Sequence, residues 1–176
     1  QWSQKIVGHK KNKYEIKRIN IVARDGAKVP ISLIYKKGIN LEKAPLLQYG
    51  YGSYGTVIDP SFKLSFMPLV DEGFIFAIAH IRGGQDLGRD WYDQGRMMKK
   101  MNTFYDFIDC TKKLHTKNIG NTNKTFAMGG SAGGLLMGAI INIEPTLYKG
   151  IVAAVPFVDV LTTMSDESIP LTTFEY

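Results

Sequence analysis

The residues with the clearest chemical potential lie at 125–136, where the apolar segment TFAM leads into GGSAGGLL and forms a G-x-S-x-G motif around Ser131. Glycines two residues before and after the serine allow a strand and a helix to approach closely across a strained turn. Such a nucleophile elbow exposes the serine hydroxyl and aims the Ala132 N–H at the oxyanion formed when serine attacks a carbonyl. The sequence therefore predicts Ser131 as a nucleophile and Ala132 as a backbone oxyanion donor.

Two other interpretations of the motif are an inert glycine-rich turn and a phosphate-binding loop. A phosphate loop would carry a lysine directly before the serine or threonine, or a G-x-G-x-x-G run, and neither pattern occurs at this point. Acyl-transfer chemistry is therefore favoured over phosphate binding.

A second cluster, LLQYGYGSYG at 46–55, also follows an apolar segment. Ligand sites of open α/β sheets lie where the strands end, so this loop is expected beside the serine. A tyrosine hydroxyl in the loop could donate a second hydrogen bond to an oxyanion. Without other information, the cluster is equally well interpreted as a tight aromatic turn.

The elements needed to position these loops are those of an α/β fold. Alternating apolar residues on both sides of the turn signal at 24–27 predict an antiparallel hairpin. Short apolar runs alternating with helical periods then predict parallel strands with crossover helices. The predicted strands are 45–49, 74–80, 124–129 and 150–156, and the predicted helices are 61–72, a segment with an apolar face at 104–114, and 132–143. The polar residues 1–13 are predicted to be a tail or linker, and 14–176 the domain.

Composition and charge exclude several function classes. The chain has 176 residues, 44% hydrophobic and 22% charged, which excludes a disordered, collagen-like or coiled-coil protein. No apolar run approaches the roughly 18 to 20 residues of a membrane span. The net charge of +6 arises from residues 1–43, so a solvated basic arm is favoured over nucleic-acid binding. A single cysteine, Cys110, is compatible with a reducing, cytoplasmic compartment.

Five stretches together resemble the oligopeptidase B branch of the prolyl oligopeptidase family of serine peptidases. They are YGYGSYG at 49–55, IRGGQDLG at 81–88, WY at 91–92, MGGSAGG at 128–134 and PFVDVLTTMSDESIPLTT at 156–173. The resemblance implies an α/β-hydrolase fold and cleavage of short peptides after Arg or Lys. It also implies an upstream β-propeller domain that covers the active site, and no metal or cofactor.

The resemblance also assigns roles to individual residues. It implies Ser131 as the nucleophile, with Tyr51 as the side-chain oxyanion donor beside the Ala132 N–H. It implies Glu175 as the partner of the basic substrate side chain before the cleaved bond. Asp59 matches the first of two aspartates that bind the next substrate residue, whereas Ser61 stands where the family has the second.

The general base of the expected triad is missing from the chain. In this fold the order is Ser, Asp, His, yet no histidine follows Ser131, and His9, His80 and His115 all precede it. We therefore expect a partial catalytic domain, inactive alone, whose triad Asp and His lie in a downstream segment. Asp159 is expected to be structural.

Two other readings stay open at this point. Another α/β-hydrolase, such as an esterase, would share the elbow but not Glu175. A truncated protein without catalytic activity could instead act by binding.

Overall fold

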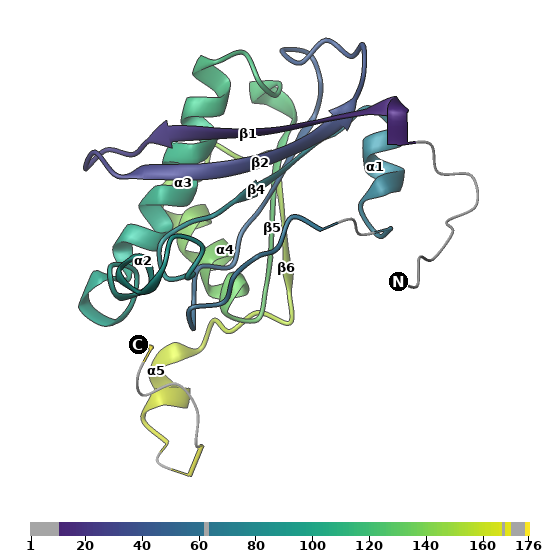
Figure 1. Ribbon diagram of the computed structural model, residues 1–176. Helices are drawn as coiled ribbons and strands as arrows, with labels where there is room; N and C mark the ends of the chain where they lie inside the picture. The colour runs from purple at the N-terminus through teal and green to yellow at the C-terminus, as the bar shows by residue number, and fades with distance from the viewer. Residues whose placement is uncertain (1–10, 62–63, 167, 170–174) are drawn as a thin grey trace, which may run out of the picture.

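The computed structural model describes residues 11–61, 64–166, 168–169 and 175–176. Among these residues, six strands form one sheet in the order β1-β2-β4-β3-β5-β6 (Figure 1). Helices cover both faces of this sheet, so the described region is a layered α/β structure, as predicted.

The first two strands form the predicted antiparallel hairpin. Strands β1 (Tyr14–Val22) and β2 (Lys28–Lys36) pair along their whole length. The Ala23 N–H donates to the Ala27 carbonyl at 2.8 Å, and Gly26 has a φ of 90°, a conformation that favours glycine. The turn signal at 24–27 therefore acts as the sequence indicated.

The other four strands are parallel to one another and lie close to their predicted bounds. They are β3 (Leu46–Tyr49), β4 (Ile75–Ala79), β5 (Thr125–Gly130) and β6 (Gly150–Ala154). Strand β4 also pairs antiparallel with β2, which joins the hairpin to the parallel part of the sheet. Because parallel strands end at the same edge, the loops after β3, β4 and β5 converge.

Two helices cover one face of the sheet and a shorter helix covers the other (Figure 1). Helices α3 (Met101–Thr116) and α4 (Ala132–Ile143) bury apolar side chains against the larger core cluster, and Cys110 is buried there. Helix α1 (Met67–Asp71) packs on the opposite face, and is much shorter than the predicted 61–72. Pro68 stands in its first turn, a position that proline favours, and residues 62–63 lie outside the described residues.

Several short elements were not predicted from the sequence. These are the helices α2 (Arg89–Asp93) and α5 (Val160–Met164) and the 3-10 helices η1 (Lys11–Lys13), η2 (Met97–Lys99) and η3 (Thr122–Lys124). At three to five residues each, they are too short for an apolar period to reveal them. The η1 turn lies in the predicted tail, of which residues 1–10 fall outside the described residues.

Strand β6 forms one edge of the sheet within the described region. Its residue Val152 is 51% exposed, so this edge is much less buried than the central strands.

The described helices include none that is both long and apolar enough to cross a membrane.

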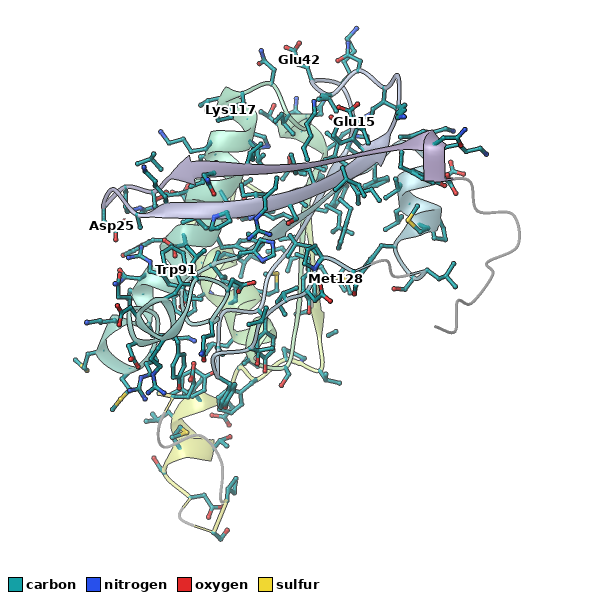
Figure 2. All side chains as sticks on the ribbon, viewed as in Figure 1. Glu15, Asp25, Glu42, Trp91, Lys117 and Met128 are labelled. Atoms are coloured by element: carbon teal, nitrogen blue, oxygen red, sulfur yellow. The ribbon has the colours of Figure 1, made fainter. Side chains whose placement is uncertain are left out.

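A buried arginine connects the hairpin to the loop after β4. Arg82 donates two hydrogen bonds to the Asp106 carboxylate of α3, at 2.6 and 2.8 Å, and a third to Asp25 at 2.6 Å. Figure 2 shows Asp25 at the hairpin tip, with Trp91 in the segment below it, and the Arg82 guanidinium lies 5.8 Å from the Trp91 ring centroid. The ion pairs outweigh the effect of burial and raise the pKa of Arg82, so the charge persists.

We predict that Arg82→Met destabilises the protein by about 3 to 5 kcal/mol, because Asp106 is then a buried carboxylate without its cation. Urea unfolding followed by circular dichroism measures the change. The control is Arg89→Met, which removes an arginine whose side chain is 64% exposed in its pair with Asp93 and should alter stability little. Equal effects of the two substitutions would contradict the prediction.

Candidate active site

Ser131 lies at the turn between strand β5 and helix α4. Its φ of 55° and ψ of −117° are strained for a residue with a side chain, and the residue is exposed to solvent. The Ser131 N–H donates to the Ala154 carbonyl at 2.9 Å, which holds the turn against the end of β6. The predicted elbow geometry is confirmed.

The glycines around the serine are required by close backbone packing. A Cβ at Gly129 would lie 2.3 Å from the Gly133 carbonyl oxygen, and a Cβ at Gly133 would lie 2.8 Å from the Gly50 carbonyl oxygen. Both distances are below any tolerable contact, and the obstructing atoms are backbone, which cannot move aside. The elbow and the loop after β3 therefore touch through their main chains.

Ala132 is the first residue of α4 and is buried. As a first-turn residue, its N–H has no acceptor inside the helix. It also carries part of the positive charge of the helix N-terminus. The structure therefore places this N–H directly after Ser131 at the start of α4, and its role as an oxyanion donor stays a prediction.

Tyr51 is the side chain that the loop after β3 brings to the serine. It is half-buried, and its ring lies against the elbow, since a Cβ at Gly133 would lie 3.4 Å from Tyr51 Cδ2. Burial and, to a lesser degree, the negative charge of Glu175 raise the pKa of Tyr51. The phenol therefore stays protonated well into the alkaline range and can donate a hydrogen bond.

The two residues after Tyr51 are held against the start of helix α3. Gly52 has a φ of 70°, and a Cβ there would lie 2.4 Å from Thr103 Cγ2. Lys100 Nζ donates to the Gly52 carbonyl at 2.8 Å and to Ser53 Oγ at 2.6 Å. These contacts fix the backbone on which Tyr51 stands.

Glu175 is buried, with only 1% of its surface exposed. Lys100 Nζ lies 3.2 Å from one carboxylate oxygen, and the Tyr92 hydroxyl donates to the other at 2.8 Å. The Glu175 carbonyl also accepts from the Met97 N–H at 2.9 Å. The residue is therefore anchored to the segment that precedes α3.

Sequence reasoning did not identify Lys100 and Tyr92 as partners of this carboxylate. Lys100 follows another lysine between methionines, and nothing in the pattern distinguishes an internal cation from a solvated one. Tyr92 belongs to the WY motif that carried part of the resemblance, but its contact with Glu175 depends on residues 83 positions apart.

The negative charge of Glu175 also acts on three tyrosine side chains. It contributes to raising the pKa of Tyr51, Tyr54 and Tyr176, in each case behind the larger effect of burial. Glu175 and Tyr51 therefore lie close enough for their charges to interact, and with Ser131 they form the candidate cluster, whose catalytic and binding roles stay predictions.

Asp59 lies on a different part of the structure from Glu175, beside helix α1. It is exposed, on the rim of an apolar cavity of about 110 Å³ between the sheet and helix α1. The walls are apolar residues such as Ile34, Phe66 and Ile78. A contact of Asp59 with a substrate therefore stays a prediction.

The histidines whose surroundings are described have other partners. His80 Nε2 lies 2.8 Å from Ser32 Oγ, and its Nδ1 lies 2.7 Å from an Asp86 oxygen, so both ring nitrogens are occupied. His115 Nε2 lies 2.8 Å from Thr125 Oγ1. His9 falls outside the described residues. Neither described histidine is placed to act as a base for Ser131.

Asp159 also has a structural role, as expected. Its carboxylate caps helix α5 by accepting from the Thr162 N–H at 3.3 Å. Across the described part of the chain, no group of three or more His, Cys, Asp and Glu side chains is arranged to hold a metal ion.

Comparison with known proteins identifies the family. The profile of the prolyl oligopeptidase family, peptidase S9, matches residues 60–176. The chain belongs to the prolyl oligopeptidase family. It is 51% identical over 175 residues to dipeptidyl aminopeptidase BI of Pseudoxanthomonas mexicana, covering 98% of this chain and 24% of that protein. It is also 51% identical over 154 residues to Protease 2 of Moraxella lacunata, covering 87% of this chain and 22% of that protein.

Solved structures of the prolyl oligopeptidase family share the fold. Oligopeptidase B from Trypanosoma brucei, in a closed form with covalently bound antipain, superimposes with a TM-score of 0.92 at 48% identity. The match covers 96% of this chain and 24% of that one. The described sheet and helices are thus part of an α/β-hydrolase catalytic domain, and the chain spans about a quarter of the length of these serine peptidases.

We predict that Tyr51→Phe in the full-length protein lowers kcat by about 10² to 10³, because one donor to the oxyanion is lost. Steady-state hydrolysis of an activated ester measures the effect. Tyr54→Phe is the matched control, since Tyr54 belongs to the same loop but is 43% exposed and should leave kcat unchanged. An unchanged kcat in Tyr51→Phe would contradict the role of Tyr51 as an oxyanion donor and would favour the interpretation of residues 46–55 as an aromatic turn.

Proposed function

We propose that the full-length protein is a serine oligopeptidase that cleaves short peptides on the carboxyl side of Arg or Lys. The observation that carries the proposal is the grouping of an exposed strained serine, a protonated tyrosine donor and a buried carboxylate in one cluster. The covalent antipain adduct of the Trypanosoma brucei enzyme supports covalent chemistry in this family.

In the proposed reaction Ser131 Oγ attacks the carbonyl carbon of the scissile bond, and its proton passes to a general base. The negative charge that develops on the carbonyl oxygen receives hydrogen bonds from the Ala132 N–H and the Tyr51 hydroxyl. Collapse of this intermediate expels the amine, which takes the proton, and leaves an ester on Ser131. Water then attacks the ester carbonyl and gives a proton to the base. The bond to Ser131 Oγ breaks, Oγ takes that proton, and the peptide acid leaves.

Glu175 is proposed to bind the basic side chain that precedes the cleaved bond. A carboxylate offers about four lone-pair directions, of which Lys100 and Tyr92 take two. Because Glu175 is only 1% exposed, the proposed complex requires the side chains that cover it to move aside, so that a substrate guanidinium reaches the remaining directions. Its planar fork suits a carboxylate better than a single ammonium does. Arg substrates should therefore be preferred over Lys substrates, and the partners of the protein are short basic peptides.

The remaining parts of the protein are proposed from the same family. We propose a general base and its orienting acid in a segment that continues the sheet, and a β-propeller that restricts access to short peptides. We also propose that the protein needs no cofactor and acts in the cytoplasm, since its single cysteine is buried and demands no oxidising compartment.

The 176-residue chain alone is predicted to give no measurable turnover of an Arg-containing peptide, because no histidine follows Ser131 in the sequence and the two described histidines are held by other partners. Loss of that partner costs several orders of magnitude in rate. The assay compares purified chain with its Ser131→Ala variant, and turnover above the level of that variant would contradict the prediction.

In the full-length protein, Glu175→Gln should lower kcat/KM for an Arg substrate by about 10² or more, because it removes the charge and keeps the shape of the side chain. Hydrolysis of a neutral activated ester should change little. Parallel kinetics on both substrates measure this split. Asp90→Asn, which removes an exposed carboxylate from helix α2, is the control and should affect neither.

Two results would overturn the assignment of Glu175. Equal losses on both substrates would give the residue a role in folding or in the chemical step, and unchanged kinetics on both would remove it from the substrate pocket.

A further inference from the structure

Lys100 is a buried cation between Glu175 and the loop that carries Tyr51, and the proposed reaction does not use it. Its side chain is only 11% exposed, although an ammonium group normally stays in water. Burial lowers the pKa of Lys100, whereas the charge of Glu175 acts in the opposite direction. A buried lysine of this kind needs partners that offset the cost of removing its charge from water.

Every proton of the ammonium group has an acceptor. One donates to the Gly52 carbonyl at 2.8 Å, one to Ser53 Oγ at 2.6 Å and one to Glu175 at 3.2 Å. An ammonium has three donors, so this set is complete. The three acceptors come from two different parts of the chain, the loop that carries Tyr51 and the segment that carries Glu175.

The backbone of Lys100 is fixed independently of these contacts. The residue ends η2 and begins α3, with its N–H donating to the Met97 carbonyl at 2.9 Å and its carbonyl accepting from Thr103 at 3.0 Å. The side chain therefore reaches into the cluster from a rigid junction. Such an anchor can hold a loop within the narrow tolerance that catalysis requires.

We propose that Lys100 is a positioning and specificity-determining residue: it ties the Tyr51 loop to the pocket carboxylate and sets the charge that a substrate cation meets there. This proposal rests on the proposed function of the cluster. Lys100 touches neither the reacting carbonyl nor Ser131 in the described contacts, so it acts through Tyr51 and Glu175.

The positioning effect follows from the geometry of the loop. Without the ammonium, the Gly52 carbonyl and the buried Ser53 hydroxyl lose a shared donor, and the Tyr51 backbone is released at its next residue. A displacement of about 1 Å at an oxyanion donor can cost up to about 10² in rate. The loss should affect charged and neutral substrates alike, because both form the same oxyanion.

The charge effect runs in the opposite direction and is confined to cationic substrates. A substrate cation on Glu175 shares that carboxylate with Lys100, and like charges about 4 to 6 Å apart oppose each other. Removing the lysine should therefore tighten binding of an Arg substrate. A neutral ester should show no such gain.

The test is Lys100→Met in the full-length protein, which keeps the length of the side chain and removes its charge and donors. We expect kcat for a neutral ester to fall about 10-fold to 100-fold. We expect KM for an Arg substrate to fall on the order of tenfold. Rates are expressed per active site, counted with a covalent serine inhibitor, so that misfolded protein does not enter the value. The neighbouring Lys99→Met, at an exposed position, is the matched control and should change neither quantity.

Two double variants separate positioning from a general structural loss. The fall in ester kcat should vanish in a Tyr51→Phe background, and the fall in KM should vanish in a Glu175→Gln background, because each effect acts through that partner. Losses that multiply with those of Tyr51→Phe, or an unchanged ester kcat, would overturn the positioning role. An Arg-substrate KM that is unchanged or raised would overturn the charge role.

A failure of the proposed function gives a different pattern. If Glu175→Gln alone does not discriminate Arg from neutral substrates, the pocket assignment fails, while the effect of Lys100→Met on the ester still reports on the Tyr51 loop. Should Lys100→Met not fold, Lys100→Gln retains neutral donors and should still lower KM for the Arg substrate, with a smaller loss of ester kcat. An unchanged KM in that variant would also count against the proposal.

Discussion

The close approach of three stretches of backbone is the constraint on which the site depends. Strand β5, the first turn of α4 and the loop after β3 meet where Gly129 and Gly133 lack side chains and lie against the Gly50 carbonyl. Any Cβ at Gly129 or Gly133 would collide with a carbonyl oxygen, so the main chains can touch only with glycine at these positions. This contact brings Tyr51 against the elbow that carries Ser131 and the first N–H of α4.

A second constraint is that charges buried near the end of the sheet are paired. Arg82 with Asp106 joins the loop after β4 to helix α3. Lys100 joins the start of α3 to Glu175 and, through the Gly52 carbonyl, to the loop after β3. Because an unpaired buried charge is costly, each pair fixes the relative positions of the segments that supply it. Helix α3 thus packs against the core and also holds the loops that carry the candidate site.

The sequence by itself determined the parts of the fold that depend on local pattern. Strand and helix periods located β3 to β6, α3 and α4, and the hairpin turn at Gly26 followed from its residue types. The elbow around Ser131 was equally predictable, because the motif needs glycine at fixed spacing from the nucleophile. Helix α1 was overestimated because its apolar period continues on the N-terminal side of Met67, where the described residues 64–66 form turns and not helix.

Only the tertiary structure decided which distant residues share the site. Lys100 and Tyr92 became partners of Glu175 across 75 and 83 positions, and His80 was committed to Ser32 and Asp86, not to the nucleophile. The physical reason is that local pattern reports which side chains are buried but carries no information on which buried charges meet. Pairing is set by the order of strands and by the crossing of α3 behind the sheet, and these depend on the whole chain packing at once.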